Sequence, residues 1–175
     1  GFVGDDESML SVNLYIDVAF AGDVVSQRST TGIHLTIEGP HTNFPIQGIS
    51  CKQTSQGLST PEVEIVAACH GYCKVLLPAL DIWEVIAPRL QAPRFHEDNQ
   101  ATIAVITSGR NPTMRHLHRV HRVDVQWLYE RLGNHTERDP TILYYEDTDN
   151  MSADIYTKSF DNPQKWAHAR KLISV

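Results

Sequence analysis

Residues 94–105 read Arg-Phe-His-Glu-Asp-Asn-Gln-Ala-Thr-Ile-Ala-Val, and they join the expected end of a strand to the expected start of a helix. The apolar residues after position 100 supply the inner face of that helix. Asp98 and Asn99 stand at the junction, where both residue types cap helices well. A carboxylate at the carboxyl end of a strand also lies where open α/β sheets place their functional sites. Asp98 is therefore either a helix cap or a site residue, and acidic partners elsewhere in the chain would favour the second interpretation.

The composition indicates a folded protein of moderate size. A chain of 175 residues suits one domain with a sizeable core. Its 41% hydrophobic and 21% charged residues are typical of globular proteins, so disorder is not expected. The net charge of −6 and pI near 5.8 argue mildly against a nucleic-acid partner, which usually binds a basic surface. A cluster of carboxylates that binds divalent metal would lower the pI as well.

The cysteines and the apolar segments point to an intracellular protein. Cys69 and Cys73 are one helical turn apart, Cys51 stands alone, and no second Cys/His pair has zinc-finger spacing, so buried thiols in a reducing compartment are expected. No apolar run approaches the roughly 18 residues needed to span a bilayer, and no signal peptide opens the chain, so no membrane partner is expected. Residues 1–10 are expected to be a linker or cut edge. The domain is expected over 11–160, and the tail at 161–175 to pack on it through Trp166 and Leu172.

Hydrophobic periodicity predicts a mixed α/β chain. Alternating apolar residues predict strands at 11–20, 33–37 and 44–51, and their short connections favour an antiparallel meander. A helix is expected to begin with Thr60 as N-cap and Pro61 in the first turn. Further helices are expected at 79–86, after residue 98, at 120–132 and at 151–158, the last one capped by Asp149 or Asn150. The remaining strand is expected at 141–145.

Four acidic residues fall on four of these elements. Asp17 lies within the first strand, where Asp is depleted, and Asp154 lies one turn into the last helix, where capping cannot explain it. Glu64 either complements the helix dipole or holds a carboxylate beside the sheet. Together with Asp98 they would form an oxygen-only site of the kind that Mg²⁺ or Mn²⁺ prefers. Two ions about 3.5–4 Å apart could activate a water and stabilise the leaving oxygen of a phosphodiester.

A basic cluster follows at 115–122, and it allows two interpretations. Three arginines and three histidines crowd into eight residues: Arg115, His116, His118, Arg119, His121 and Arg122. The cluster is either the solvated start of a helix or a patch that contacts phosphates. A zinc site is disfavoured because no matching set of cysteines exists.

Five segments, in order, resemble the ribonuclease H domain of copia-type (Pseudoviridae) LTR retrotransposon polyproteins. Residues 15–23 with 28–32 are similar to Y-x-D-A-D-W-A-G-D…R-S-T-S-G, and residues 58–65 to S-S-T-E-A-E-Y. Residues 97–103 are similar to C-D-N-Q-x-A-I, 121–125 to K-H-I-D-V, and 153–158 to A-D-I-F-T-K. The resemblance covers about residues 12 to 160, and five ordered motifs are far more specific than any one of them.

The resemblance implies a ribonuclease H fold, a mixed five-stranded sheet of order 3-2-1-4-5 flanked by helices. It also implies endonucleolytic hydrolysis of the RNA strand of RNA–DNA hybrids during reverse transcription, with two Mg²⁺ or Mn²⁺ ions, next to an upstream reverse transcriptase domain of the same polyprotein in a virus-like particle. Carried over position by position, the metal-binding acids are Asp17, Glu64, Asp98 and Asp154. The hybrid is expected to contact Asn99, Gln100, Arg115, Arg119 and Arg122.

Departures from the family pattern keep other functions open. Ala19 replaces the second acid of D-A-D, Phe20 replaces its tryptophan, and Pro61 and Ile65 alter the motif around Glu64. None of them removes one of the four acids. A remnant that keeps the fold and only binds nucleic acid or a partner is the main alternative. An integrase or transposase core is disfavoured by the motif order and the missing zinc module.

Overall fold

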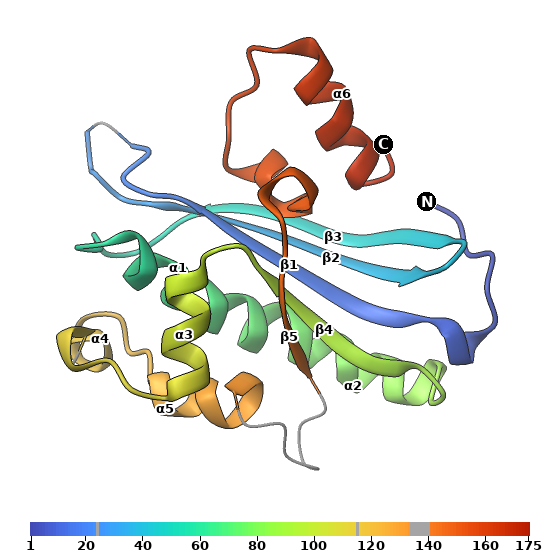
Figure 1. Ribbon diagram of the computed structural model, residues 1–175, viewed down its shortest axis with the longest axis horizontal. Coiled ribbons are helices and arrows are strands. Elements are labelled where there is room, and N and C mark those ends of the chain that lie inside the picture. Colours follow the sequence, from blue (N-terminus) through green and yellow to red (C-terminus); the bar gives the residue numbers. More distant parts are fainter. Residues whose placement is uncertain (24, 115, 134–140) are drawn as a thin grey trace.

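A computed structural model describes residues 1–23, 25–114, 116–133 and 141–175. Its centre is one five-stranded sheet of order β3-β2-β1-β4-β5 (Figure 1). The strands pair antiparallel from β1 to β2 and from β2 to β3, and parallel from β1 to β4 and from β4 to β5. This order and these directions confirm the fold that the motifs predicted. The strands are β1 (Ser11–Ala19), β2 (Thr30–Gly39), β3 (Thr42–Lys52), β4 (Gln91–Glu97) and β5 (Ile142–Tyr145).

Helices cover both faces of the sheet. Helices α1 to α5 lie on one side of it, and the short helix η6 and the C-terminal helix α6 lie on the other (Figure 1). The long helices and those near the site are α1 (Thr60–Gly71), α2 (Leu77–Ile86), α3 (Gln100–Ser108), η6 (Ser152–Tyr156) and α6 (Pro163–Leu172). The shorter helical segments are η1 (Glu7–Met9), η2 (Tyr72–Leu76), η3 (Pro112–Met114), α4 (Leu117–Val120), α5 (Val125–Leu128), η4 (Tyr129–Gly133) and η5 (Thr148–Asn150).

The main core lies between the sheet and helix α1. Alternate residues of β1 such as Leu14 and Ile16 are fully buried there, with Ile65 of the helix and Tyr72 of the following turn η2. Burial of four side chains of this size contributes about 1.5–3 kcal/mol each. This packing fixes α1 against β1, which places the helix's carboxylate beside the strand that carries Asp17.

Helix α1 continues through the π-helical turn η2 into α2, so the helix expected at 79–86 is wrong in its start. Pro78 lies just after the π-helical turn, as the second residue of α2. By length and composition, the helix from Thr60 to Ile86 could cross a membrane, with a mean hydropathy of 1.4 in its most apolar window. Core helices of soluble proteins pass the same test, and the buried side of this helix packs on β1.

The helix expected at 120–132 is also wrong, because it is divided into three pieces. The chain leaves α4 through Arg122, which has a left-handed φ of +56° that interrupts helical hydrogen bonding. Asp124 then starts α5 afresh, its carboxylate accepting a hydrogen bond from the N–H of Gln126 at 2.9 Å.

The helix expected at 151–158 is a shorter 3₁₀ segment, η6, and a second 3₁₀ segment, η5, precedes it. The expected caps are wrong as well, because the side chain of Asp147 caps η5 and no side chain caps η6. Segment η6 packs directly on β2 at Gly32. A Cβ atom at that position would lie 2.6 Å from Cγ2 of Thr157 and 2.7 Å from the carbonyl oxygen of Ala153. Glycine therefore permits the close approach that brings the end of η6 to the sheet.

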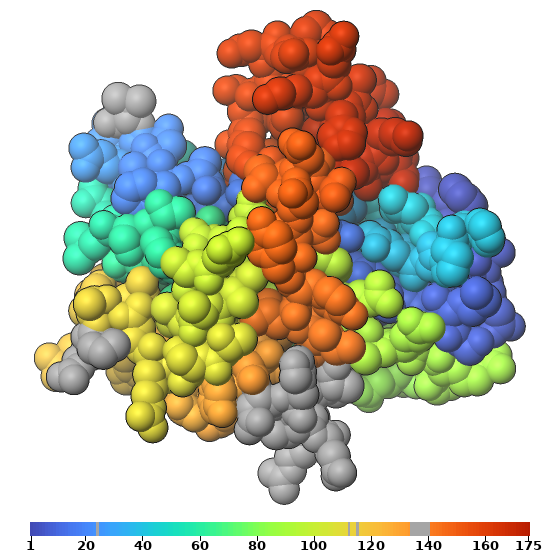
Figure 2. Space-filling model, in the orientation of Figure 1, coloured from blue at the N-terminus to red at the C-terminus, as the bar shows by residue number. Residues whose placement is uncertain are grey.

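The two ends of the chain meet at the β2–β3 turn. Phe2 forms an isolated antiparallel bridge with Asn43, and the side chain of Asn43 donates to the carbonyl of Leu172 at 3.3 Å. Helix α6 projects from the body of the molecule (Figure 2). Its Trp166 packs against Phe160 with ring centroids 5.7 Å apart but stays 44% exposed. The indole was expected to pack on the body of the domain, and it is only partly buried.

Candidate metal centre

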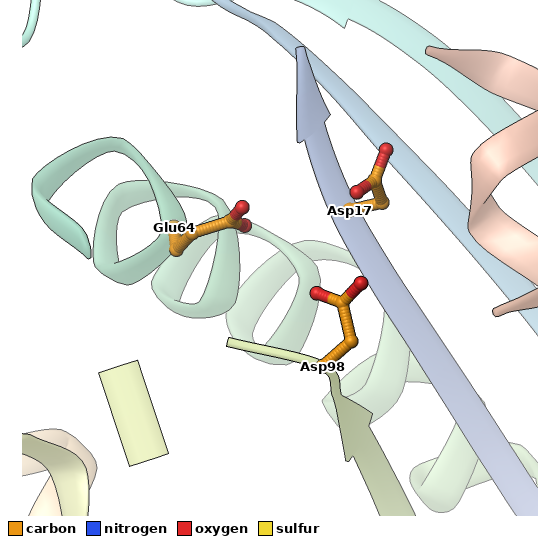
Figure 3. Close-up of side chains that lie close together, drawn as sticks. All are labelled: Asp17, Glu64 and Asp98. Atoms are coloured by element: carbon orange, nitrogen blue, oxygen red, sulfur yellow. The ribbon is translucent and has the colours of Figure 1, made fainter. Parts of the chain in front are cut away.

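Three of the four predicted acids gather at one point. Each of Asp17, Glu64 and Asp98 offers a carboxylate oxygen, and these oxygens all lie within 4.8 Å of one another. Asp17 comes from the end of β1, Glu64 from α1, and Asp98 from the residue that follows β4 (Figure 3). The parallel pairing of β1 with β4 places the ends of both strands at the same edge of the sheet.

Local structure positions each of these carboxylates. The hydroxyl of Thr157 donates to Oδ2 of Asp17 in a short hydrogen bond, and the hydroxyl of Thr148 donates to Oδ2 of Asp98 at 2.9 Å. Neither threonine was predicted as a site residue. They belong to the segments before and after η6, 50 and 140 positions away from the acids they hold, so only the folded chain identifies them.

Asn99 caps helix α3 at the junction between β4 and α3. Its side-chain oxygen accepts hydrogen bonds from the N–H groups of Ala101 and Thr102 at 3.0 and 3.1 Å. Asp98 takes no part in this cap, which leaves its carboxylate for the acidic cluster. Of the two residues at the junction that could cap the helix, Asn99 is therefore the one that caps α3.

Asp154 lies beside the cluster but outside its closest group. Its Oδ1 is 2.6 Å from Nζ of Lys158, and the same ammonium is 3.8 Å from Oδ1 of Asp17. Lys158 therefore stands between two of the predicted metal ligands. The sequence motifs assign this lysine no role, although its spacing of four residues from Asp154 places both side chains together.

Glu97 is a further buried carboxylate that sequence reasoning did not select. It is fully buried at the end of β4, and its Oε1 accepts the N–H of Asn99 at 3.1 Å. It occupies the position of the cysteine in the family motif. The sequence did hold a sign of its role, because a carboxylate in a buried strand next to Asp98 needs a hydrogen-bond donor or a cation as partner.

Burial and crowding favour the protonated forms of these acids. Burial, with the nearby charges of Glu97, Asp17 and Asp98, raises the pKa of Glu64 to about 10. Burial also raises the pKa of Asp17, and it raises the pKa of Asp154 to about 6. The pKa of Glu97 is well above its usual range for the same reason. A bound cation would reverse this cost by neutralising the repulsion.

The donors present fit a hard divalent cation. Glu64 places its Oε2 in a buried position without a hydrogen-bond partner among the residues that the structure describes. A buried carboxylate oxygen left without a donor is costly unless a cation completes it. Three oxygen donors from carboxylates match the preference of Mg²⁺ and Mn²⁺. Asp17, Glu64 and Asp98 are therefore the residues that would hold the ion.

The predicted nucleic-acid contacts lie on two segments. Gln100 is exposed at the start of α3, and Arg119 and Arg122 are exposed in and after α4. Arg115 lies outside the described residues. The segment that carries these arginines contacts α1, because Nε2 of His121 lies 3.0 Å from Oε1 of Glu62, two residues before Glu64.

Sheet order, strand direction and the position of the acids agree with one fold. The fold is ribonuclease H-like. No protein-family model matches the chain, and no curated protein sequence is similar to it. Among solved structures, the chain is similar to the N-terminal RNase H domain of rv2228c from Mycobacterium tuberculosis, as a fusion protein with maltose binding protein. The two share 12% identity over 93% of this chain and 98% of that chain, with a TM-score of 0.47.

Proposed function

We propose that the chain is a metal-dependent endonuclease that hydrolyses the RNA strand of RNA–DNA hybrids. The observation that carries the proposal is the group of oxygens from Asp17, Glu64 and Asp98 within 4.8 Å at one edge of a ribonuclease H-like sheet. Divalent cations held there would activate a water and neutralise charge at the phosphodiester. The order of the five motifs supports the finer proposal of a copia-type retrotransposon polyprotein, with a reverse transcriptase domain upstream and an intracellular, particle-associated location.

The protein's own groups have separate tasks in this proposal. Thr157 and Thr148 hold the carboxylates of Asp17 and Asp98 in place by hydrogen bonds. The exposed guanidinium groups of Arg119 and Arg122 attract the phosphates of the hybrid, which partly offsets the net charge of −6. Asn99 uses its side-chain oxygen as a cap, so its NH₂ group is the part proposed to donate to the minor groove, beside Gln100.

A catalytically weakened remnant is the second candidate, and Glu97 favours it. This acid stands where the family motif has a neutral cysteine, and it adds a buried carboxyl group beside Glu64. Unless a cation or a proton compensates, one more carboxylate in this region weakens the site by repulsion.

Cleavage of labelled RNA in a hybrid separates the two candidates. With Mg²⁺ or Mn²⁺ we expect the wild type to cut the RNA strand and Asp98→Asn to lower the rate roughly 10³-fold, or about 4 kcal/mol in activation free energy. Asp149→Asn, an exposed acid of η5 outside the cluster, should keep the wild-type rate. A folded wild type that cuts with neither metal would leave the remnant as the function.

A further inference from the structure

Lys158 places a positive charge inside the acidic site. Its Nζ is 2.6 Å from Oδ1 of Asp154 and 3.8 Å from Oδ1 of Asp17. Asp17 is thus shared between two arrangements: it belongs to the three-carboxylate group with Glu64 and Asp98, and it also faces the lysine. The four acids therefore form two overlapping sets that share Asp17: the group of three, and the Asp17–Asp154 pair that Lys158 bridges.

The backbone of η6 presents the lysine to this pair. The N–H of Lys158 bonds to the carbonyl of Asp154 at 2.9 Å, which places the two side chains one turn apart. Gly32 admits the same segment to the sheet, so the ammonium reaches Asp17 on β1. The contact therefore follows from the docking of η6 and not from a flexible surface encounter.

In a two-ion site the ions lie about 3.5–4 Å apart. Asp17 and Asp154 are the carboxylates that would hold a second ion, and the ammonium of Lys158 already lies 3.8 Å from Asp17 and 2.6 Å from Asp154. An ammonium and a divalent ion repel strongly at such separations, so they cannot both occupy the space. The positive charge of Lys158 neutralises this half of the site while the lysine remains there.

We infer that Lys158 is the resident counter-cation of the Asp17–Asp154 pair, so that the chain without nucleic acid binds one divalent ion tightly and a second only when Lys158 leaves. The inference rests on the proposed function, because it assigns the first ion to Asp17, Glu64 and Asp98. The lysine acts through the metal ligands and is a positioning residue.

Lys158 has room to leave its two acids. Its side chain is 39% exposed, so displacement does not open the core. A groove of about 890 Å³ runs between η6 and α6, and its lining includes Asp154, Lys158, Asp161, Asn162 and Lys165. A phosphate of bound nucleic acid is negatively charged, as the carboxylates are, so it offers the ammonium of Lys158 another ion-pair partner. Substrate binding and entry of the second ion are thereby coupled.

Counting bound Mn²⁺ ions tests the inference without any cleavage assay. Titration calorimetry and the electron paramagnetic resonance signal of free Mn²⁺ are measured on the full chain without nucleic acid. We expect one tight ion on the wild type and a second ion on Lys158→Met, bound at least tenfold more tightly than any second ion on the wild type. Lys158→Gln should behave as Lys158→Met does, and Lys158→Arg as the wild type does. Lys74→Met, at an exposed lysine of η2, is the matched control and should bind as the wild type.

The outcomes distinguish this inference from the function on which it rests. Equal numbers and affinities of ions on the wild type, Lys158→Met and Lys158→Gln would overturn the role of Lys158, even if the wild type cleaves hybrids. A gain of the second ion in a protein that cleaves nothing would uphold the role of Lys158 and reject the nuclease. If no variant binds Mn²⁺, both fail. Circular dichroism melts show which variants are folded, and the Met and Gln substitutions provide independent tests.

Discussion

At the residue scale, the sheet buries two histidines, His34 and His96. His34 on β2 is 1% exposed and its Nδ1 pairs with the hydroxyl of Tyr156 at 3.1 Å. His96 on β4 lies between Asn13 and Glu146, with contacts of 2.9 and 2.8 Å. Burial lowers the pKa of both to about 4, so they are neutral in the folded protein at pH 7. These groups make the fold sensitive to acid independently of the metal site.

The titration of His34 can be isolated by substitution. Because its pKa falls from 6.5 to about 4 on folding, the unfolded chain binds more protons between these values, and stability is lost as pH falls through that range. From pH 7 to pH 5 we expect the wild type to lose about 2 kcal/mol more unfolding free energy than His34→Gln does, measured in urea. His41→Gln, at an exposed position, should follow the wild type. Equal losses in His34→Gln and the wild type would contradict the assignment.

At the element scale, Glu62 joins the start of α1 to the basic segment around α4. It is 2% exposed, its Oε2 accepts the N–H of Leu58 at 3.1 Å, and its Oε1 lies 3.0 Å from Nε2 of His121 and 3.1 Å from Nε2 of His116. Ser59, the N-cap residue, makes no side-chain cap. Glu62 therefore joins the segment before the helix that carries Glu64 to its first turn, and the expectation that Thr60 is the N-cap is wrong by one position.

Removing Glu62 should loosen this junction. We expect Glu62→Ala to lower the free energy of unfolding by about 3 kcal/mol, since it removes a buried hydrogen-bond acceptor shared by Leu58 and His121. Denaturant unfolding of Glu62→Ala, His121→Ala and the double variant should give a coupling energy on the order of 1–3 kcal/mol. Glu84→Ala, an exposed acid of α2, should change stability by less than about 0.5 kcal/mol. Purely additive losses would show that Glu62 and His121 do not stabilise one another.

At the scale of the whole molecule, the acidic chain buries three of its carboxyl groups at one site, those of Asp17, Glu64 and Glu97. The net charge of −6 disfavours nucleic acid over most of the surface, while Arg119 and Arg122 offer a local exception beside α1. The buried carboxylates of the site repel one another, so the fold without metal carries an electrostatic cost. Cation binding should therefore stabilise the entire fold and not only the site.

Metal addition and removal test this expectation. At a Mn²⁺ concentration 100 times the dissociation constant, binding to the folded state alone adds about 2.7 kcal/mol. For a domain of this size we expect the melting temperature to rise by about 5–10 °C and to return on addition of a chelator. Asp98→Asn should show little of this rise, whereas Asp149→Asn should show all of it. Equal rises in Asp98→Asn and the wild type would mean that Mn²⁺ binds elsewhere.

The sequence by itself predicted the alternating strand at 11–19 and the acids Asp17, Glu64 and Asp98 that meet, and its resemblance to a known family implied the strand order. The alternation at 11–19 and the junction at Asp98 and Asn99 are local patterns, so they can be recognised without knowledge of the fold. Tertiary structure alone decided that Lys158 separates Asp154 from the other acids, that Thr157 holds Asp17 from 140 positions away, and that Glu62 meets His121. It also decided the break at Arg122, whose positive φ has no sequence signal. The reason is physical: periodicity reports which face of an element is buried, whereas the partner of a charge is set by how distant elements dock.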